Sequence, residues 1–153
     1  MRAVVTRVKS ASVTIDGKMQ GEIGQGFLIL LGVAPDDTPA ICEKLADKIL
    51  ALRVFEDDSG KMNRSISDAH GSVLVVSQFT LFADTSHGRR PSFFGAAAPD
   101  KANALYEQFL RECEARGFPP QHGIFGADMQ VTSQNDGPVT LILDTKEWNS
   151  NAN

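Results

Sequence analysis

The chain has 153 residues, a net charge of −4, 42% hydrophobic residues and 22% charged residues. These values are ordinary for a soluble globular domain, and a domain of this length buries enough surface to fold without a disulfide or a metal. The negative charge argues against a protein that binds nucleic acid over its whole surface, yet a local basic patch is enough to bind a few phosphates.

No apolar run approaches the roughly 20 residues that cross a bilayer. The longest, Phe27–Val33, has the length of a strand, and the first residues lack the apolar segment and cleavage site of a signal peptide. The sequence therefore predicts a cytoplasmic protein that does not associate with membranes.

The N-terminal part of the chain alternates β-branched apolar residues with polar ones, which is typical of strands. Asp16-Gly17 separates two such stretches and is a strong hairpin signal. Phe27–Leu31 is apolar on both faces, which favours a central place in the sheet. We predict a meander of four strands, at residues 2–9, 11–16, 18–24 and 26–33.

Two helices are indicated by apolar residues at helical spacing. Thr38-Pro39 opens the first, with threonine as cap and proline at the first helical position. The second starts at Ala98-Pro99-Asp100 and ends at Gly117. The two cysteines, Cys42 and Cys113, fall on the apolar stripes of these helices, which favours buried structural thiols over reactive ones.

Val73–Val76 has the pattern of a buried strand that continues into Ser77–Leu81. The segment 83–98 is rich in glycine, proline and polar residues, and a loop of this length in a compact domain is usually functional. Further strands are predicted at residues 52–55, 128–134 and 138–144.

Together these elements predict one α+β domain over residues 1–145, followed by a flexible tail over residues 146–153. Mainly antiparallel β-sheets would form an open, barrel-like core with two covering helices.

Three features are candidates for chemistry. Ser77–Thr80 places hydrogen-bonding side chains at the end of a buried strand, as satisfied polar groups or as a site where backbone N–H groups stabilise an oxyanion. Asn135–Pro138 joins two predicted strands, and its spacing alone favours a turn. Arg89 and Arg90, with Lys61 and Arg64 in another loop, are either solvated or in contact with phosphates.

Other chemistries are disfavoured. The three histidines, His70, His87 and His122, have no metal-ligand spacing with one another or with the cysteines, so no metal and no cofactor are expected. The chain has no Gly-x-Ser-x-Gly elbow, phosphate-binding Gly-x-x-x-x-Gly-Lys-[Ser/Thr] loop or His-Glu-x-x-His motif. If the protein is a hydrolase, it lacks an ordinary side-chain nucleophile.

At this point the sequence closely resembles the bacterial-type D-aminoacyl-tRNA deacylases over residues 1–145. Several stretches in the same order carry the resemblance. They are Met1–Val8, Gly21–Gly24, Lys61–Ser65, Ser77–Leu81, Arg90–Phe93, Phe125–Met129 and Asn135–Thr140. The chain departs from the family pattern at Thr6, Ser86–Arg89 and Phe94-Gly95. The last two lie in the loop assigned to tRNA contact, so they bear on tRNA preference and leave the chemistry intact.

The resemblance implies a homodimer with active sites at the interface and the 3′ aminoacyl-adenosine end of tRNA as the substrate. Gly137-Pro138 would be a cis dipeptide that reaches into the partner's site and rejects L-amino acids, with Arg7 bracing it. Met129 would lie beside the pocket. The pocket-lining and catalytic residues implied are Ser77, Gln78, Phe79 and Thr80.

The implied activity is hydrolysis of D-aminoacyl-tRNA, and of mischarged glycyl-tRNA, with the ribose 2′-OH assisting and backbone N–H groups holding the oxyanion. Two alternatives stay open. A non-catalytic RNA-binding module would account for Arg89-Arg90 and leave Ser77–Thr80 unexplained. A small-molecule esterase or amidase would need no basic loop.

Overall fold

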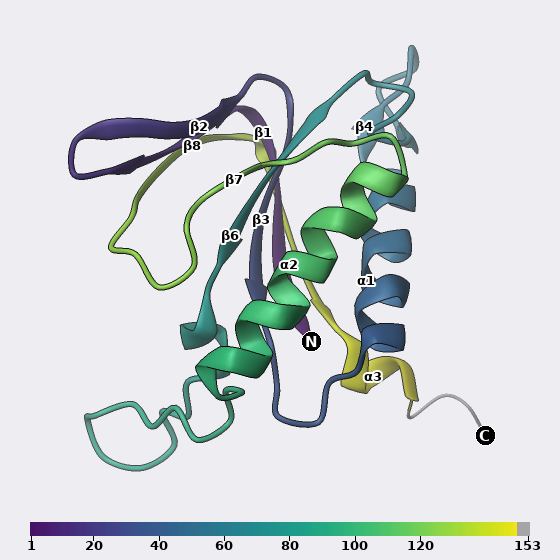
Figure 1. The fold of residues 1–153 in the computed structure, drawn as a ribbon. Coiled ribbons are helices and arrows are strands. Elements are labelled where there is room, and N and C mark those ends of the chain that lie inside the picture. The colour runs from purple at the N-terminus through teal and green to yellow at the C-terminus, as the bar shows by residue number, and fades with distance from the viewer. Residues whose placement is uncertain (150–153) are drawn as a thin grey trace.

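A computed structural model describes residues 1–149 as a strongly curved sheet with two long helices packed beside it (Figure 1). The main sheet has six strands: β1 (Arg2–Ile15), β2 (Lys18–Ile23), β3 (Gly26–Gly32), β6 (Ser72–Ser77), β7 (Gln121–His122) and β8 (Gln130–Asp144). β4 (Phe55–Glu56) and β5 (Met62–Arg64) form a separate hairpin. The helices are α1 (Pro39–Ala51), α2 (Pro99–Ala115), the short α3 (Thr145–Asn149) and a 3-10 helix over Phe79–Phe82.

β1 organises the sheet because it is paired along both edges. On one edge β3 pairs with residues 2–8 and β2 pairs with residues 11–15. On the other edge β8 runs antiparallel to β1 from Arg2 to Thr14. β8 has no further strand partner within residues 1–149, so it ends the sheet on that side.

The predicted four-strand meander is corrected in one respect, since residues 2–9 and 11–16 form the single strand β1. The polar pair Lys9-Ser10 resembles a break in the sequence, but it sits at a bulge, where the register with β8 shifts and Lys9 has no partner. As a result β3 pairs with β1 rather than with β2. The hairpin at Asp16-Gly17 is confirmed, and both residues have positive φ angles, 52° and 76°.

The last two predicted strands, 128–134 and 138–144, are likewise one strand, β8. Asn135–Pro138 is therefore no reversing turn. Thr6 faces Thr140 and Val8 faces Asn135, so the single residue Arg7 on β1 lies opposite the residues 136–139 on β8. This wide bulge lifts Asp136–Val139 out of the ladder while the chain keeps its direction.

The predicted fold class, an α+β domain with a barrel-like core, is confirmed, and β3 is central in the sheet as its two apolar faces predict. The sheet is mixed, because β3 and β6 pair in parallel, as do β6 and β7. It nearly closes where β2 approaches β7. A Cβ on Gly21 would lie 3.3 Å from the Gln121 side-chain oxygen.

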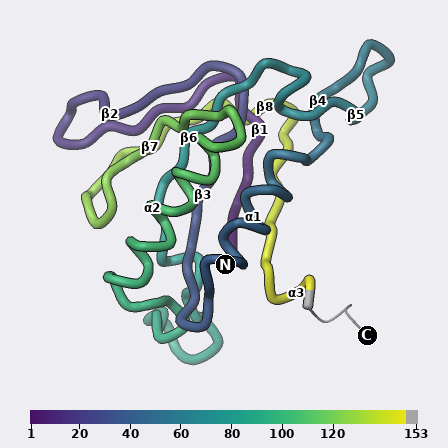
Figure 2. The backbone as a smooth tube through the Cα atoms, turned by 45° about the vertical axis from the view of Figure 1, so that its right-hand side comes forward, coloured from purple at the N-terminus to yellow at the C-terminus, as the bar shows by residue number. Residues whose placement is uncertain are grey.

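Two apolar clusters fill the molecule. The larger lies between the sheet and α1 and α2, which cover the same face of it (Figure 2). The smaller lies inside the curved sheet, and Met129 packs against its edge. Thr38 caps α1 as predicted, accepting a hydrogen bond from the Ile41 N–H.

Local boundaries differ from the sequence prediction at three places. The strand predicted at 52–55 is Phe55–Glu56, and β6 ends at Ser77, where a 3-10 helix replaces the predicted extension to Leu81. Residues 146–149, assigned to a flexible tail, belong to α3, and Trp148 packs against the larger cluster. The rest of that tail, residues 150–153, lies outside the described residues. Within residues 1–149 no helix is both long and apolar enough to span a membrane.

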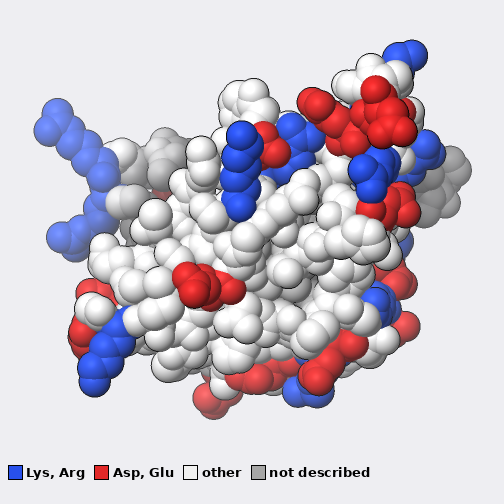
Figure 3. Space-filling model, turned by 90° about the horizontal axis from the view of Figure 1, so that it is seen from above, with Lys and Arg blue, Asp and Glu red and all other residues white. Residues whose placement is uncertain are grey.

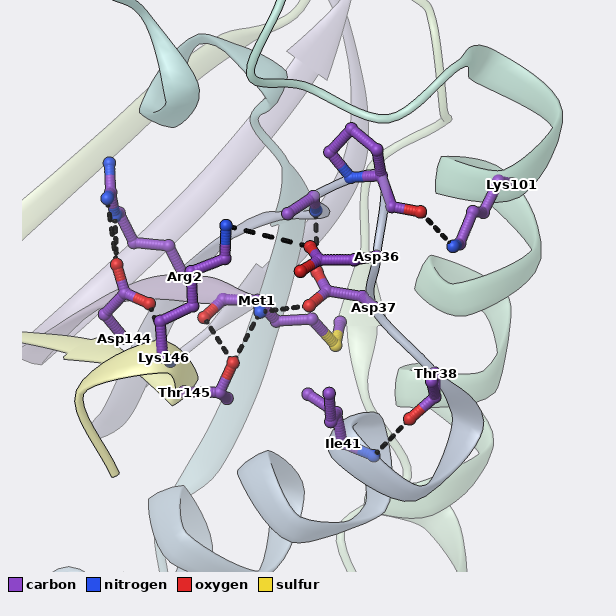
Figure 4. A network of polar contacts seen from close by, with 12 residues as sticks. Met1, Arg2, Asp36, Asp37, Thr38, Ile41, Lys101, Asp144, Thr145 and Lys146 are labelled. Carbon is purple, nitrogen blue, oxygen red and sulfur yellow. Dashed lines mark hydrogen bonds and ion pairs between the residues drawn. The ribbon is translucent and has the colours of Figure 1, made fainter. Parts of the chain in front are cut away.

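The backbone amino group of Met1 is buried where α3 meets the loop before α1 (Figure 4). It lies 2.7 Å from the Asp37 carboxylate and 2.7 Å from the Thr145 hydroxyl. The same carboxylate accepts the Ala34 N–H at 2.6 Å. Because each charge is removed from water, the pair is stable only while both partners are present.

Replacing Asp37 by asparagine is expected to lower the free energy of unfolding by about 3–5 kcal/mol, since it leaves a buried ammonium without its counter-charge. Denaturant unfolding followed by circular dichroism measures this change. Lys146→Ala is the matched control, because its ion pair with Asp36 is 3.7 Å long and exposed on both sides. It should change stability by less than about 0.5 kcal/mol. Equal effects of the two substitutions would contradict this account.

Candidate active site

A cavity of about 600 Å³ opens beside the end of β6. Its walls come from the end of β6, the start of the 3-10 helix, the loop before α2, the start of α2 and the segment that leads into β8. Most of the lining side chains are apolar. They are Val76, Ser77, Gln78, Phe79, Phe93, Ala96, Ala97, Pro99, Ala102, Phe125, Gly126, Ala127, Met129 and Val131.

The polar part of this cavity is the turn where β6 becomes the 3-10 helix. The Gln78 N–H donates to the Leu31 carbonyl at 2.8 Å, which extends the parallel pairing of β3 and β6 by one residue. Phe79 and Thr80 then begin the 3-10 helix, where the first N–H groups have no acceptor within the helix. The turn thus carries two backbone donors without an acceptor in the helix, and the first of them belongs to a residue that lines the cavity.

Three of the four predicted catalytic residues, Ser77, Gln78 and Phe79, line the cavity, and Thr80 does not. Thr80 is exposed, and its hydroxyl accepts a hydrogen bond from the Gln78 side-chain amide. The Phe79 ring packs edge-on against Phe93, with ring centres 5.2 Å apart. Met129, predicted to lie beside the site, is one of the lining residues.

The bulge of β8 forms a second, separate feature. The Gly137-Pro138 peptide bond is cis. Gly137 has a φ of +131°, and a Cβ there would lie 2.8 Å from the Val139 side chain and 3.0 Å from the Arg7 guanidinium. Both the angle and the space therefore require glycine at this position.

Arg7 supports the bulge from beneath. It is buried, its Nε donates to the Asp136 carbonyl at 3.0 Å, and its NH1 donates to the Val54 carbonyl at 2.6 Å. The Asp136 carboxylate lies 3.7 Å from the Arg7 Nε and provides the opposite charge. Asn135 ties the ends of the bulge together, since its side chain accepts the Val139 N–H at 2.9 Å and donates to the Thr140 hydroxyl at 2.8 Å.

Within one chain the cavity and the bulge are far apart. Val131, at the cavity, pairs with Val13 on β1, whereas the bulge lies opposite Arg7. Val13 lies six positions from Arg7 along one strand, which corresponds to about 20 Å of extended chain. The Val131 side of the cavity is therefore well separated from the bulge along the sheet of its own chain.

The four predicted phosphate contacts occupy opposite ends of the molecule. Arg89 and Arg90 are exposed in the loop between the 3-10 helix and α2, whereas Lys61 and Arg64 belong to the β4–β5 hairpin (Figures 1 and 2). At the hairpin end, basic and acidic side chains alternate around a largely uncharged surface (Figure 3). Arg64 is also engaged, since it donates to the Asp68 carbonyl. The four basic residues therefore lie in two separate pairs and do not form one patch.

The cysteines are confirmed as buried. Burial raises the pKa of each thiol to about 12, so both are protonated at neutral pH and neither is a nucleophile. Within residues 1–149 no group of three or more His, Cys, Asp and Glu side chains is placed to hold a metal ion.

Sequence reasoning gave no individual role to several residues that shape these features. Phe93 and the segment 125–127 line the cavity, and Asn135 closes the bulge. Phe93 follows the arginine pair, so its aromatic ring beside a basic loop was a usable signal. No sequence signal indicated the hydrogen bonds of Asn135, because these bonds depend on a bulge that the sequence does not indicate.

Comparisons with known proteins agree with the family resemblance of the sequence. Residues 4–144 match the family model described as D-Tyr-tRNA(Tyr) deacylase. A protein of Opitutus terrae named D-aminoacyl-tRNA deacylase is 58% identical over 146 residues, which is 95% of this chain and 97% of that one. A protein of Deinococcus radiodurans with the same name is 55% identical over 94% of this chain and 99% of its own length.

Among solved structures, one titled "c-Myc DNA Unwinding Element Binding Protein" is 44% identical, with a TM-score of 0.89 over 94% of this chain and 98% of that one. A second, titled as a structural analysis of a probable eukaryotic D-amino acid tRNA deacylase, is 17% identical with a TM-score of 0.82, covering 93% of this chain and 97% of that one. At that identity the second likeness concerns the fold alone.

Proposed function

The chain belongs to the D-Tyr-tRNA(Tyr) deacylase family, and from that premise we propose that it hydrolyses the ester of D-aminoacyl-tRNA to free tRNA and the D-amino acid. The observation that carries this proposal is the pair of backbone N–H groups of Phe79 and Thr80, which have no acceptor within the 3-10 helix and belong to the turn whose residues Ser77–Phe79 line an open apolar cavity. Such donors stabilise an oxyanion without a side-chain nucleophile. Mischarged glycyl-tRNA is a second substrate of the same site.

A complete site is proposed to need two chains. Within residues 1–149, β8 ends the sheet with an unpaired edge, and the side chains of residues 130–135 are exposed on both of its faces. Farther along the strand Ile142 is 71% exposed. A long exposed edge strand is a surface for pairing with another chain. A two-fold contact there would bring the Gly137 bulge of one subunit to the cavity of its partner, which makes up for the separation within one chain.

The chemistry proposed is attack by water on the ester carbonyl carbon. Negative charge develops on the carbonyl oxygen, and the N–H groups of Phe79 and Thr80 can stabilise it by donating hydrogen bonds. The bond to the ribose 3′-oxygen then breaks, and that oxygen takes a proton. The neighbouring 2′-OH, held beside the ester in every molecule of substrate, assists the transfer of the proton from water. No residue of the cavity needs to act as a base.

Chirality is proposed to be read by rejection. The carbonyl of Gly137 accepts the substrate's α-amino group in one orientation. The bulge is held on either side of Gly137, because Arg7 donates to the Asp136 carbonyl and the Asn135 side chain accepts the Val139 N–H. In this orientation an L side chain would collide with the bulge, whereas a D side chain points away from it. Glycine has no side chain to collide and is admitted.

A non-catalytic nucleic-acid-binding module is the second candidate. The solved structure 44% identical to this chain carries a title that names DNA binding. Arg89 and Arg90 are exposed as that role requires. The candidate gives no reason for the free donors beside the cavity. Turnover of an aminoacyl ester separates the two functions, because a binding module releases no amino acid.

The purified protein, with no added metal, is expected to deacylate D-Tyr-tRNA and Gly-tRNA and to leave L-Tyr-tRNA intact. Gly137→Ala should lower D-Tyr-tRNA turnover at least about 10-fold, because a Cβ at this φ displaces Val139 and Arg7. Gly17→Ala, in the exposed β1–β2 turn where a Cβ meets nothing, is the matched control for a positive-φ glycine. Loss of the D and L esters at equal rates by the wild-type protein would overturn the proposal.

Phe79→Pro removes one proposed oxyanion donor at a helix position that tolerates proline. It is expected to lower kcat about 100-fold or more, whereas Phe79→Ala, which keeps the N–H, should cost far less. Thr80→Ala should weaken turnover without abolishing it, and a substrate ending in 2′-deoxyadenosine should react much more slowly. Complete loss in a folded Thr80→Ala variant would instead indicate a threonine nucleophile or base.

A further inference from the structure

The mouth of the cavity carries an aromatic surface that the proposed chemistry leaves unused. Phe79, Phe93 and Phe94 are 54%, 39% and 96% exposed, and they are the only aromatic residues among the exposed large hydrophobic side chains of residues 1–149. Phe79 and Phe93 line the cavity, and Phe94 directly follows Phe93 in the chain. Single exposed apolar residues need no explanation, but three exposed rings brought together in this way do. Phe79 and Phe93 pack on each other, so the ring of Phe94 alone is free on both faces.

The loop that carries Phe94 has a fixed base. The backbones of Asp84 and Ser92 exchange two hydrogen bonds, of 2.7 and 2.9 Å, and the Ala96 N–H returns to the Phe93 carbonyl at 3.0 Å. The two bonds enclose the segment 85–91, which includes Arg89 and Arg90, and hold it next to the aromatic surface. Two cations and an exposed ring thus stand just outside the cavity on one anchored loop.

We propose that Phe94, together with Arg89 and Arg90, is a docking surface for the unpaired cytidines that precede the terminal adenosine of aminoacyl-tRNA. This inference rests on the proposed function, which places the terminal adenosine and its ester in the cavity. The nucleotides that precede the terminal adenosine must then run out of the cavity past Phe93 and Phe94. An aromatic ring stacks on any base, and arginines beside it meet the phosphates, which is how single strands are held without hydrogen bonds to the bases.

The alternative occupant is a second copy of this chain, with Phe94 buried in a subunit contact. Charge favours the nucleic acid. A single strand of nucleic acid carries one negative charge per nucleotide, whereas this chain spreads a net charge of −4 over 153 residues, so two adjacent arginines complement a run of phosphates better than they complement a second copy. The exposed edge of β8 already offers the surface proposed for the second subunit.

The test compares a long and a minimal substrate. With D-Tyr-tRNA, Phe94→Ala is expected to raise KM roughly 10-fold and leave kcat nearly unchanged. With D-Tyr esterified to adenosine alone, the same variant should match the wild type. Phe94→Trp should restore the tRNA reaction, and Phe94→Leu, which is apolar but cannot stack, should not. Met19→Ala removes another exposed apolar side chain, from β2, and should change kcat and KM for neither substrate.

Several results would overturn the inference. They are an unchanged KM for tRNA in Phe94→Ala, equal losses on both substrates, full activity of Phe94→Leu, or a change of native mass in Phe94→Ala that assigns the ring to a subunit contact. If the wild type cleaves neither D ester, the proposed function fails and the docking surface is judged by binding. Uncharged tRNA should then bind Phe94→Ala roughly 10-fold more weakly than wild type, and equal affinity would refute the surface.

Discussion

Pairing of β1 along both of its edges is the constraint from which the rest of the structure follows. β2 and β3 share one edge of β1 and β8 takes the other, and within residues 1–149 no strand pairs with the outer edge of β8. The same ladder contains the bulge opposite Arg7, so Gly137 is presented on that open edge. The strand that limits the sheet is therefore also the strand that carries the proposed chiral selector.

The site that results is built from backbone more than from side chains. Burial raises the pKa of both thiols, and the polar groups that line the cavity belong to the turn over Ser77–Phe79. Backbone groups held by a sheet need no reorganisation during a reaction, and they do not depend on the identity of the amino acid that they exclude. A fixed carbonyl and a fixed wall suit an enzyme that must accept many D side chains and no L side chain.

The sequence predicted the elements better than their connections. Apolar periodicity located α1, α2 and the central strand, and Asp16-Gly17 located the hairpin. The break predicted between residues 9 and 11 and the turn predicted at Asn135–Pro138 are both bulges, because a bulge also interrupts an alternating pattern with polar residues. The sequence also singled out the residues of the two parts of the proposed site. Their separation within one chain, and the contact of Arg7 with the Val54 carbonyl, depend on tertiary structure that no local pattern indicates.

The most direct test of a site shared between two chains is complementation in mixed dimers. Phe79→Pro impairs the cavity and Gly137→Ala impairs the bulge, so each variant alone is nearly inactive on D-Tyr-tRNA. If the halves come from different chains, unfolding and refolding an equal mixture gives mixed dimers in half of the molecules, each with one intact site of two. Turnover should then recover to about a quarter of the wild-type value. A mixture no more active than its components would contradict the shared site.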